Sequence, residues 1–233
     1  MRPHRFHRLR SVLTRRQPDL TVLMEKVNKS HNFSAILRNC DAVGVLDAHA
    51  VPPDHGLDLH HGTSAGTRKW IRVHRHATVD EAVARLKEEG FALLAAHPSA
   101  DAVDYREPDY TRPTAFMMGA ELYGVSERGL ELADVHVTIP MVGMVHSLNV
   151  SVATALLLYE AYRQREAADM YAESRLDDEA FRRILFEWAY PTLGRRYRGE
   201  GRPYPLLDED GQIMTGGSSG KNERGPGRDG TST

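Results

Sequence analysis

The chain has 233 residues, 41% of them hydrophobic, and a formal net charge of -2 at pH 7. This length fits one domain with extensions, and the apolar content is enough to bury a sizeable core. The single cysteine, Cys40, excludes a disulfide framework and a zinc cage of several thiolates. No apolar run reaches the roughly 20 residues that span a membrane, and no signal peptide is evident, so we expect a soluble cytoplasmic protein.

Strand and helix signals alternate along most of the chain. A basic helix is predicted over residues 2–17. Strands are predicted over residues 21–24, 45–51, 71–73, 91–96, 115–119 and 135–139. The helices between and after them begin at N-cap residues, which we assign to Asn32, Thr78 and Ser147. Because several strands are apolar throughout, the sequence predicts an α/β fold: a parallel sheet with helices on both faces.

The remaining segments are a loop and the C-terminal region. Residues 54–66 read as a loop with a short helical piece, and residues 177–188 as an amphipathic helix that ends before Pro191. Residues 215–233 are rich in glycine and serine, which predicts disorder. Histidines in the 54–66 loop and at positions 74 and 76 have no thiolate support, so surface residues are expected there and no metal is predicted.

Arginine is concentrated near both ends of the chain. Six arginines lie within residues 2–16 with no acidic residue among them, and four more lie within residues 195–202. A guanidinium binds phosphate through paired hydrogen bonds, so these ends suit a nucleic acid. Ordinary solvated charge explains the same pattern, and composition does not choose between the two.

Three polar clusters follow predicted strands. They are Asn32 with Arg38, Glu121 within residues 119–124, and Ser147 with Asn149. Ligands of open α/β sheets bind beyond the carboxyl ends of strands, so the three clusters can share one site. By spacing alone this signal is weak, because any protein of this class has polar loops in such places.

The residues around these clusters resemble the three motifs of the SpoU/TrmH branch of the SPOUT RNA 2'-O-ribose methyltransferases. The first motif is matched over residues 32–44, with Arg38 and Asp41 in place, and the second over residues 118–124. The third is matched over residues 139–153, from Ile139-Pro140-Met141 to Ser147-Leu148-Asn149. The motifs occur in the family's order and spacing, and the resemblance covers about residues 1–214.

The resemblance implies a deep C-terminal trefoil knot that holds S-adenosylmethionine, and a homodimer with the site near the subunit interface. It divides the chain into a basic helical extension (1–19), a SPOUT methyltransferase domain (20–165), a helical extension (166–214) and a disordered tail (215–233). Methyl transfer from a sulfonium requires neither a metal nor a membrane.

The implied activity is 2'-O-methylation of the ribose of guanosine-18 in the D-loop of tRNA. Two alternatives stay open. One is the same chemistry on another tRNA position or on ribosomal RNA, and the other is a catalytically silent RNA-binding protein. A short basic helix in place of a separate N-terminal RNA-binding domain favours tRNA.

By resemblance, five residues form the catalytic set: Asn32, Arg38, Glu121, Ser147 and Asn149. We expect Arg38 to stabilise the developing alkoxide and the adjacent phosphate, because a guanidinium is hardly ever deprotonated. Glu121 and Asn149 would orient Arg38. Asn32 would cap its helix and tune the same network, and Ser147 would cap the long helix near the substrate.

The remaining expected contacts are to cofactor and RNA. The cofactor is expected to bind largely through the backbone of Ala96, Gly119, Ile139, Met141 and Leu148. Contacts to tRNA phosphates are expected from Arg5, Arg8, Arg16, His31, Arg163 and Arg165.

Overall fold

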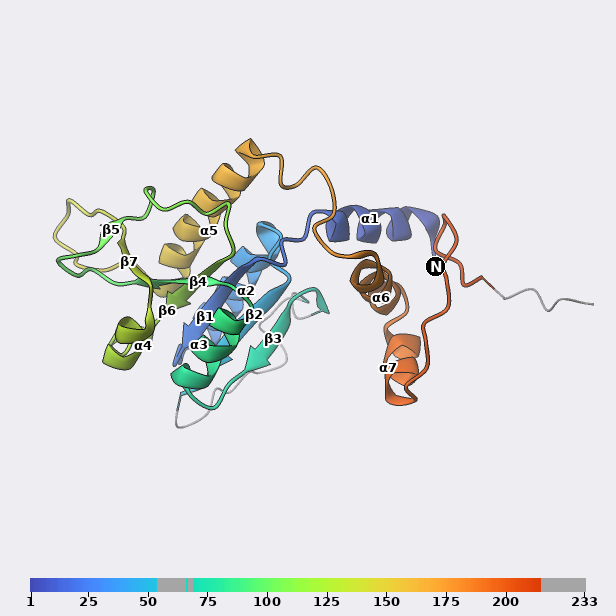
Figure 1. Cartoon of the computed structure of the whole chain (residues 1–233), viewed down its shortest axis with the longest axis horizontal. Coiled ribbons are helices and arrows are strands. Elements are labelled where there is room, and N and C mark those ends of the chain that lie inside the picture. The colour runs from blue at the N-terminus through green and yellow to red at the C-terminus, as the bar shows by residue number, and fades with distance from the viewer. Residues whose placement is uncertain (54–65, 67–68, 215–233) are drawn as a thin grey trace, which may run out of the picture.

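The computed structural model describes residues 1–53, 66 and 69–214 (Figure 1). The predicted loop over residues 54–66, apart from Gly66, and the predicted disordered tail over residues 215–233 lie outside the described residues.

The described chain is built around one seven-stranded sheet with the order β3-β2-β1-β6-β4-β7-β5. Every strand pair is parallel, which confirms the predicted parallel sheet. The strands are β1 (Leu20–Glu25), β2 (Asp47–Val51), β3 (Arg72–Arg75), β4 (Ala92–Ala96), β5 (Val103–Asp104), β6 (Thr114–Met118) and β7 (Val135–Thr138). The short strand β5 was not predicted, since two residues carry no periodicity. All of β6 is buried, because it lies between β1 and β4 and is covered on both faces.

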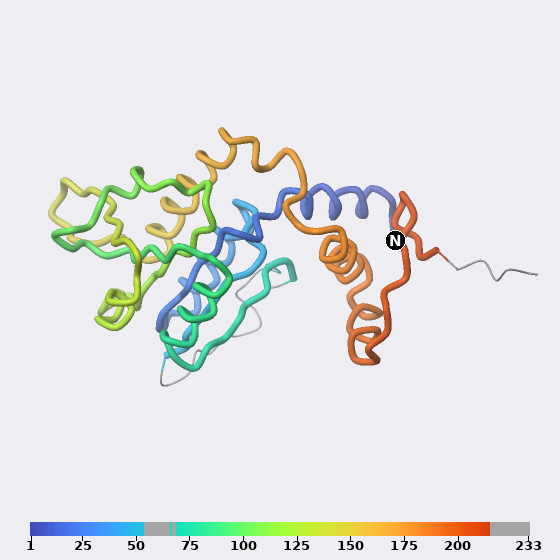
Figure 2. Tube along the Cα trace, in the orientation of Figure 1, coloured from blue at the N-terminus to red at the C-terminus, as the bar shows by residue number. Residues whose placement is uncertain are grey.

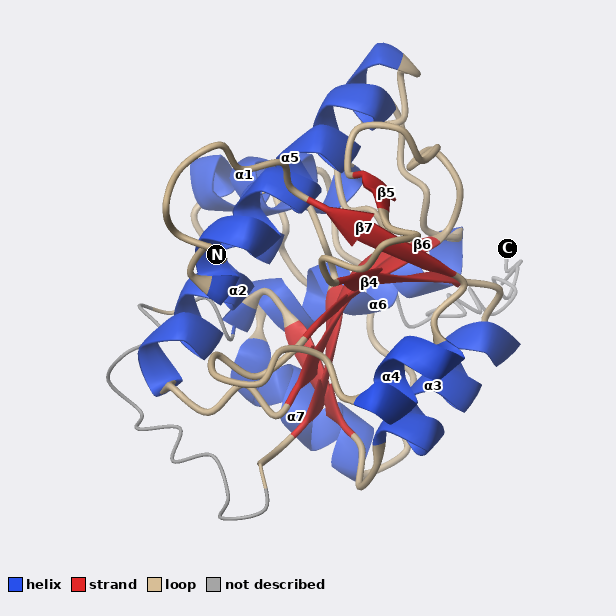
Figure 3. Cartoon of the chain, turned by 90° about the vertical axis from the view of Figure 1, so that its left-hand side faces the viewer, coloured by secondary structure: helices blue, strands red, loops and turns tan. Residues whose placement is uncertain are grey.

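Helices cover both faces of the sheet (Figure 3). On one face, α2 (Ser30–Ala42) and α5 (Val150–Ala167) bury residues such as Ile36 and Leu158 in the larger core. On the other face, α3 (Val79–Glu88) and α4 (Glu127–Leu132) form a second core around Val83 and Leu86. Cys40 is fully buried in the larger core, and this burial raises the pKa of its thiol to about 12, as expected of an inert cysteine.

Two predicted helix caps are wrong. Helix α2 begins at Ser30 after Lys29, so Asn32 lies inside its first turn. Helix α5 begins at Val150, and its N-cap is Asn149, whose side chain accepts a hydrogen bond from the backbone N–H of Ser151. Ser147 therefore caps no helix. Thr78 does cap α3 and accepts from the N–H of Glu81, as predicted.

Three further helices pack together beside the sheet: α1 (Pro3–Thr14), α6 (Asp178–Ala189) and α7 (Pro191–Gly199) (Figures 1 and 2). Phe6 and Leu13 of α1 contribute to a third core with Leu185 and Trp188 of α6. Helix α7 was not predicted. Pro191 ends α6 but occupies the first turn of α7, where a missing N–H costs no hydrogen bond.

Two arginines that were expected to bind RNA are instead buried, so those expectations are wrong. Arg165 uses all five N–H groups, donating to Asp19, Gln17 and three backbone carbonyls. Arg16 donates to the carboxylate of Asp41 and to a backbone carbonyl, and its guanidinium lies over the ring of Trp188. Neither guanidinium is accessible to a phosphate.

Three histidine rings stack across β2 and β3. His49 lies between His74 and His76, with ring centroids 5.0 and 5.2 Å away, and its Nδ1 is 2.9 Å from Nε2 of His76. His76 is buried, which contradicts its assignment to the surface, whereas His74 is exposed and hydrogen-bonds to Asp47. Burial, together with the charge of the neighbouring imidazoles, lowers the pKa of His49 to about 4.

We expect Arg165→Ala to lower the free energy of unfolding by about 3 kcal/mol, because it leaves Oε1 of the buried Gln17 and Oδ1 of Asp19 without their donor. Urea unfolding followed by circular dichroism measures this change. The matched control is Arg163→Ala, which removes an exposed arginine paired only with Glu160 and should cost about 0.5 kcal/mol or less. Equal stability of the two variants, with tRNA affinity lost only in Arg165→Ala, would contradict the structural role.

Candidate active site

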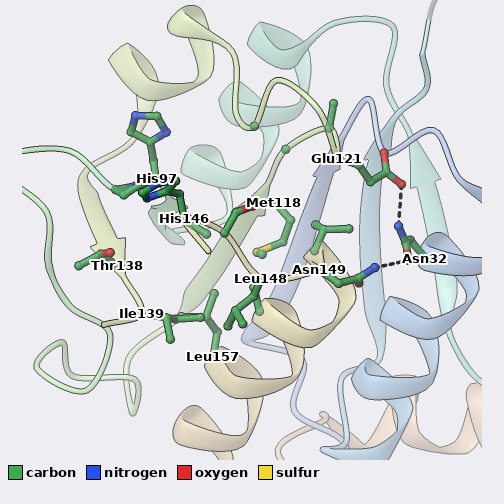
Figure 4. Close-up of a pocket in the computed structure, with 18 of the residues that line it drawn as sticks. Asn32, His97, Met118, Glu121, Thr138, Ile139, His146, Leu148, Asn149 and Leu157 are labelled. Carbon is green, nitrogen blue, oxygen red and sulfur yellow. Dashed lines mark hydrogen bonds between the residues drawn. The ribbon is translucent and has the colours of Figure 1, made fainter. Parts of the chain in front are cut away.

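A pocket of about 440 Å³ opens at the carboxyl ends of β4, β6 and β7, beside the N-terminus of α5 (Figure 4). Its lining includes all five residues expected to hold the cofactor, namely Ala96, Gly119, Ile139, Met141 and Leu148. Val137 and Leu157 add apolar wall, whereas Asn32, Glu121 and Asn149 supply polar side chains. The polar clusters therefore meet at the edge of the sheet where ligands of α/β proteins bind.

The carboxylate of Glu121 anchors the polar side of the pocket. It accepts hydrogen bonds from the backbone N–H groups of Asn28 and Lys29, at 3.1 and 3.0 Å, and from the side-chain amide of Asn32 at 2.9 Å. Burial alone would raise the pKa of Glu121, but these donors outweigh burial and lower that pKa. Glu121 is thus a fixed anion rather than a proton acceptor.

Asn32 extends the network to the third loop. Its Oδ1 accepts a hydrogen bond of 3.1 Å from Nδ2 of Asn149, and Asn149 in turn caps α5 (Figure 4). Asn32 is buried, and both the nitrogen and the oxygen of its amide form hydrogen bonds with side chains distant in sequence. Three segments distant in sequence are therefore locked together by one chain of hydrogen bonds.

The turn after β6 is compact because two glycines meet in it. A Cβ added to Gly119 would lie 1.9 Å from the carbonyl carbon of Gly124, so no other residue fits at position 119. Gly124 has a φ of +70°, a conformation that favours glycine. Ala120 and Gly124 close the turn through mutual backbone hydrogen bonds of 2.9 and 2.8 Å.

The loop between β7 and α5, unlike the turn after β6, is not fixed by hydrogen bonds to any described residue. Within the described chain, no hydrogen bond involves residues 140–148. Several apolar side chains of this loop face solvent, and Val142 and Met144 are 106% and 92% exposed. The backbone amides and carbonyls beside Met141 and Leu148 are therefore free to bind a ligand.

Arg38 does not take part in the network of its own chain. It is exposed on α2, does not line the pocket, and makes no hydrogen bond or ion pair with any described residue. The expectation that Glu121 and Asn149 orient Arg38 is therefore wrong within one chain, because both side chains are bonded to Asn32 instead. Ser147 does line the pocket, but as an exposed loop residue.

The expected RNA contacts lie apart from one another. Arg5 and Arg8 are exposed on α1, in the group of three helices, and His31 is exposed at the start of α2. Arg163 is exposed on α5 and pairs with Glu160. None of these four lines the pocket.

Sequence reasoning missed three basic side chains in the pocket lining: Lys29, His97 and His146. His97 directly follows the apolar strand β4, so its position after a strand end was a usable signal. His146 stood within the third motif and Lys29 in a polar loop, where nothing marked them out. Among the described residues, no group of three or more His, Cys, Asp or Glu is placed to hold a metal ion, and no helix could cross a bilayer.

Comparison with known proteins identifies the family. The model of the SpoU rRNA Methylase family matches residues 19–159, and the model of the SpoU rRNA methylase C-terminal region matches residues 163–216. The chain belongs to the SpoU methylase family. The pocket at the carboxyl ends of β4, β6 and β7 is therefore the candidate active site of a SpoU methylase.

Curated SpoU relatives are similar over nearly their whole lengths. The tRNA (guanosine(18)-2'-O)-methyltransferase of Escherichia coli K12 is 50% identical, over 91% of this chain and 94% of its own. The enzyme of the same name from Thermus thermophilus is 54% identical, over 79% of this chain and 95% of its own.

Solved SpoU structures share the fold. The TrmH/SpoU tRNA modifying enzyme of Aquifex aeolicus superposes with a TM-score of 0.76 at 43% identity, over 81% of this chain and 96% of its own. AviRb of Streptomyces viridochromogenes, solved in complex with the cofactor AdoMet, gives a TM-score of 0.59 at 27% identity, over 65% of this chain and 62% of its own.

We expect Gly119→Ala to destabilise the protein by about 2 kcal/mol or more, because the new methyl group would overlap the backbone of Gly124. Thermal unfolding measures the loss. Gly199→Ala is the control, since a Cβ there meets no atom within 4 Å and the site is remote. A melting temperature of Gly119→Ala equal to that of the control would show that the turn can accommodate the methyl group without loss of stability.

Proposed function

We propose that this SpoU methylase transfers a methyl group from S-adenosylmethionine to the ribose 2'-hydroxyl of guanosine-18 in the D-loop of tRNA. The observation that carries the proposal is the Glu121–Asn32–Asn149 network beside a pocket at the carboxyl ends of the strands. Relatives named for this activity at 50% and 54% identity support the choice of substrate.

The pocket suits a nucleoside cofactor. Ile139, Leu148 and Leu157 offer apolar wall to a flat base, and the unbonded backbone of residues 140–148 offers donors and acceptors to its polar edge. When bound, S-adenosylmethionine supplies an electrophilic methyl group on its sulfonium. The fixed negative charge of Glu121 lies on the same pocket wall and favours a cationic ligand.

The finer features of the fold are also proposals. Membership of the family supports a deep trefoil knot in the C-terminal half of residues 20–165. The loops after β4, β6 and β7, which line a common pocket, suit such a knot. We treat residues 1–19 and 166–214 as helical extensions that pack on each other through the third core. We also propose a cytoplasmic location, which a tRNA substrate supports.

We propose a homodimer that packs through α5. Val152, Leu156 and Tyr159 are 47%, 38% and 52% exposed, and their spacing puts them on one face of the helix. A second copy placed on this face would cover them. Because Arg38 is exposed on the neighbouring helix α2 and absent from its own pocket, we assign it to the pocket of the partner subunit.

In this arrangement each residue has a distinct task. The guanidinium of Arg38 stabilises the charge that develops on the 2'-oxygen and on the adjacent phosphate. Asn32 and Glu121 fix the loops that shape the cofactor pocket. Arg5, Arg8, His31 and Arg163, all exposed, remain the proposed contacts to tRNA phosphates.

The deciding experiment is transfer of label from S-adenosylmethionine to an unmodified tRNA transcript, followed by nuclease mapping. We expect 2'-O-methylguanosine at position 18. Label at another tRNA position, or in ribosomal RNA only, would support 2'-O-methylation but would show that the substrate nucleotide is a different one. Cofactor binding without any label would favour a silent RNA-binding protein.

We expect Arg38→Ala to abolish methylation while leaving cofactor affinity, measured by calorimetry, unchanged. Mixing its subunits with Glu121→Ala subunits should restore about one quarter of the wild-type rate, since half of the dimers then carry one intact composite site. If no activity returns after subunit exchange, the two substitutions impair different sites of the mixed dimer. Arg38 would then act at the pocket of its own chain.

A further inference from the structure

The turn between Gly119 and Gly124 presents two large apolar side chains to solvent. Leu122 is 77% exposed and Tyr123 is 84% exposed, and Leu122 lines the mouth of the pocket. Single exposed apolar residues are ordinary. Here, however, two neighbours project from a turn whose backbone is fixed at both ends, next to the proposed active site.

The position of this tip is fixed by the anchor network. Glu121 directly precedes Leu122, and its carboxylate is bonded to Asn28, Lys29 and Asn32. The backbone beneath Tyr123 is closed by the mutual hydrogen bonds of Ala120 and Gly124. An aromatic ring on such a base has only two side-chain torsions to lose on binding, so the entropic cost of contact is small.

Two basic residues lie in the segment to which Glu121 is bonded. Lys29 lines the same pocket as Leu122, and its backbone N–H is bonded to Glu121. His31 is exposed two residues further on, at the start of α2. An exposed aromatic ring near basic residues is the combination that binds single-stranded nucleic acid, because the ring stacks on a base while the basic side chains face phosphates.

We propose that Tyr123 is a stacking platform for one unpaired nucleobase of the tRNA substrate, with Leu122 against the edge of that base and Lys29 and His31 facing the flanking phosphates. The inference rests on the proposed function and deepens it. A ribose 2'-hydroxyl inside a folded loop reaches the pocket only if its nucleotide is splayed out, and stacking on Tyr123 compensates for the lost base stacking.

The test compares Tyr123→Ala with Tyr123→Phe and Tyr123→Trp, using the full chain and an unmodified tRNA transcript. We expect Tyr123→Ala to raise the KM for tRNA and the Kd of the complex by about 5- to 100-fold, with the KM for S-adenosylmethionine unchanged. The Phe and Trp variants should restore both values. Leu206→Ala, which removes an exposed apolar side chain elsewhere, should match the wild type.

A second measurement reports stacking directly. A transcript with 2-aminopurine in place of the target guanosine should change fluorescence on binding the wild type and lose that change with Tyr123→Ala. Unchanged KM, Kd and fluorescence in Tyr123→Ala would overturn the proposal. So would a shift of that variant from dimer to monomer in light scattering, because the tip would then belong to a subunit interface.

Failure of the proposed function has a different signature. If the wild type binds S-adenosylmethionine but labels no tRNA, the wild-type result is enough to reject guanosine-18 methylation, and no variant is needed. The stacking proposal is then decided by the Kd of the unmodified transcript, and an equal Kd for wild type and Tyr123→Ala overturns it as well.

Discussion

One carboxylate holds together the polar side of the site. Glu121 follows β6, yet its oxygens are occupied by donors from the segment after β1 and from the first turn of α2. Through Asn32, the same interaction reaches Asn149 and thereby fixes where α5 begins. Because these donors hold the carboxylate in its charged form, the network keeps its geometry across the neutral range. This interaction fixes the polar wall of the pocket, whereas the loop over residues 140–148 remains free to adapt to a ligand.

Much of the fold could be predicted from the sequence because local signals and tertiary structure agree there. Apolar strands alternating with helices indicated a parallel sheet, and the Thr78 cap is present as predicted. The caps assigned to Asn32 and Ser147 failed for a physical reason. An asparagine near a helix start has the same sequence signature whether its amide binds its own backbone or a carboxylate 89 positions away. Strand order is equally invisible locally, and nothing in the residues of β6 states that it lies between β1 and β4.

The RNA-binding arginines show a second limit. Arg163 and Arg165 are two positions apart on α5, so their side chains leave the helix about 200° apart. One is exposed and the other is wholly buried under Asp19 and Gln17. Composition counts both as positive charge, and only the surroundings reveal that Arg165 holds the start of β1 against the end of α5. The five expected cofactor residues do line one pocket, because a motif resemblance carries tertiary information that charge patterns lack.

The histidine stack makes one edge of the sheet sensitive to acid. Within the described part of the sheet, strand β3 pairs only with β2, and His49 of β2 stays neutral because its pKa is lowered to about 4. Since an unfolded histidine takes up its proton near pH 6.5, the stability gained from neutral His49 is complete above that pH and is lost as pH falls toward 4. The charge of Asp47 opposes this loss at His49, whereas that of Arg85 adds to it. Release of β3 would uncover the backbone of β2, an open strand edge on which another molecule can pair. Acidification toward pH 4 therefore weakens the edge of the sheet opposite β5, far along the strand order from the pocket.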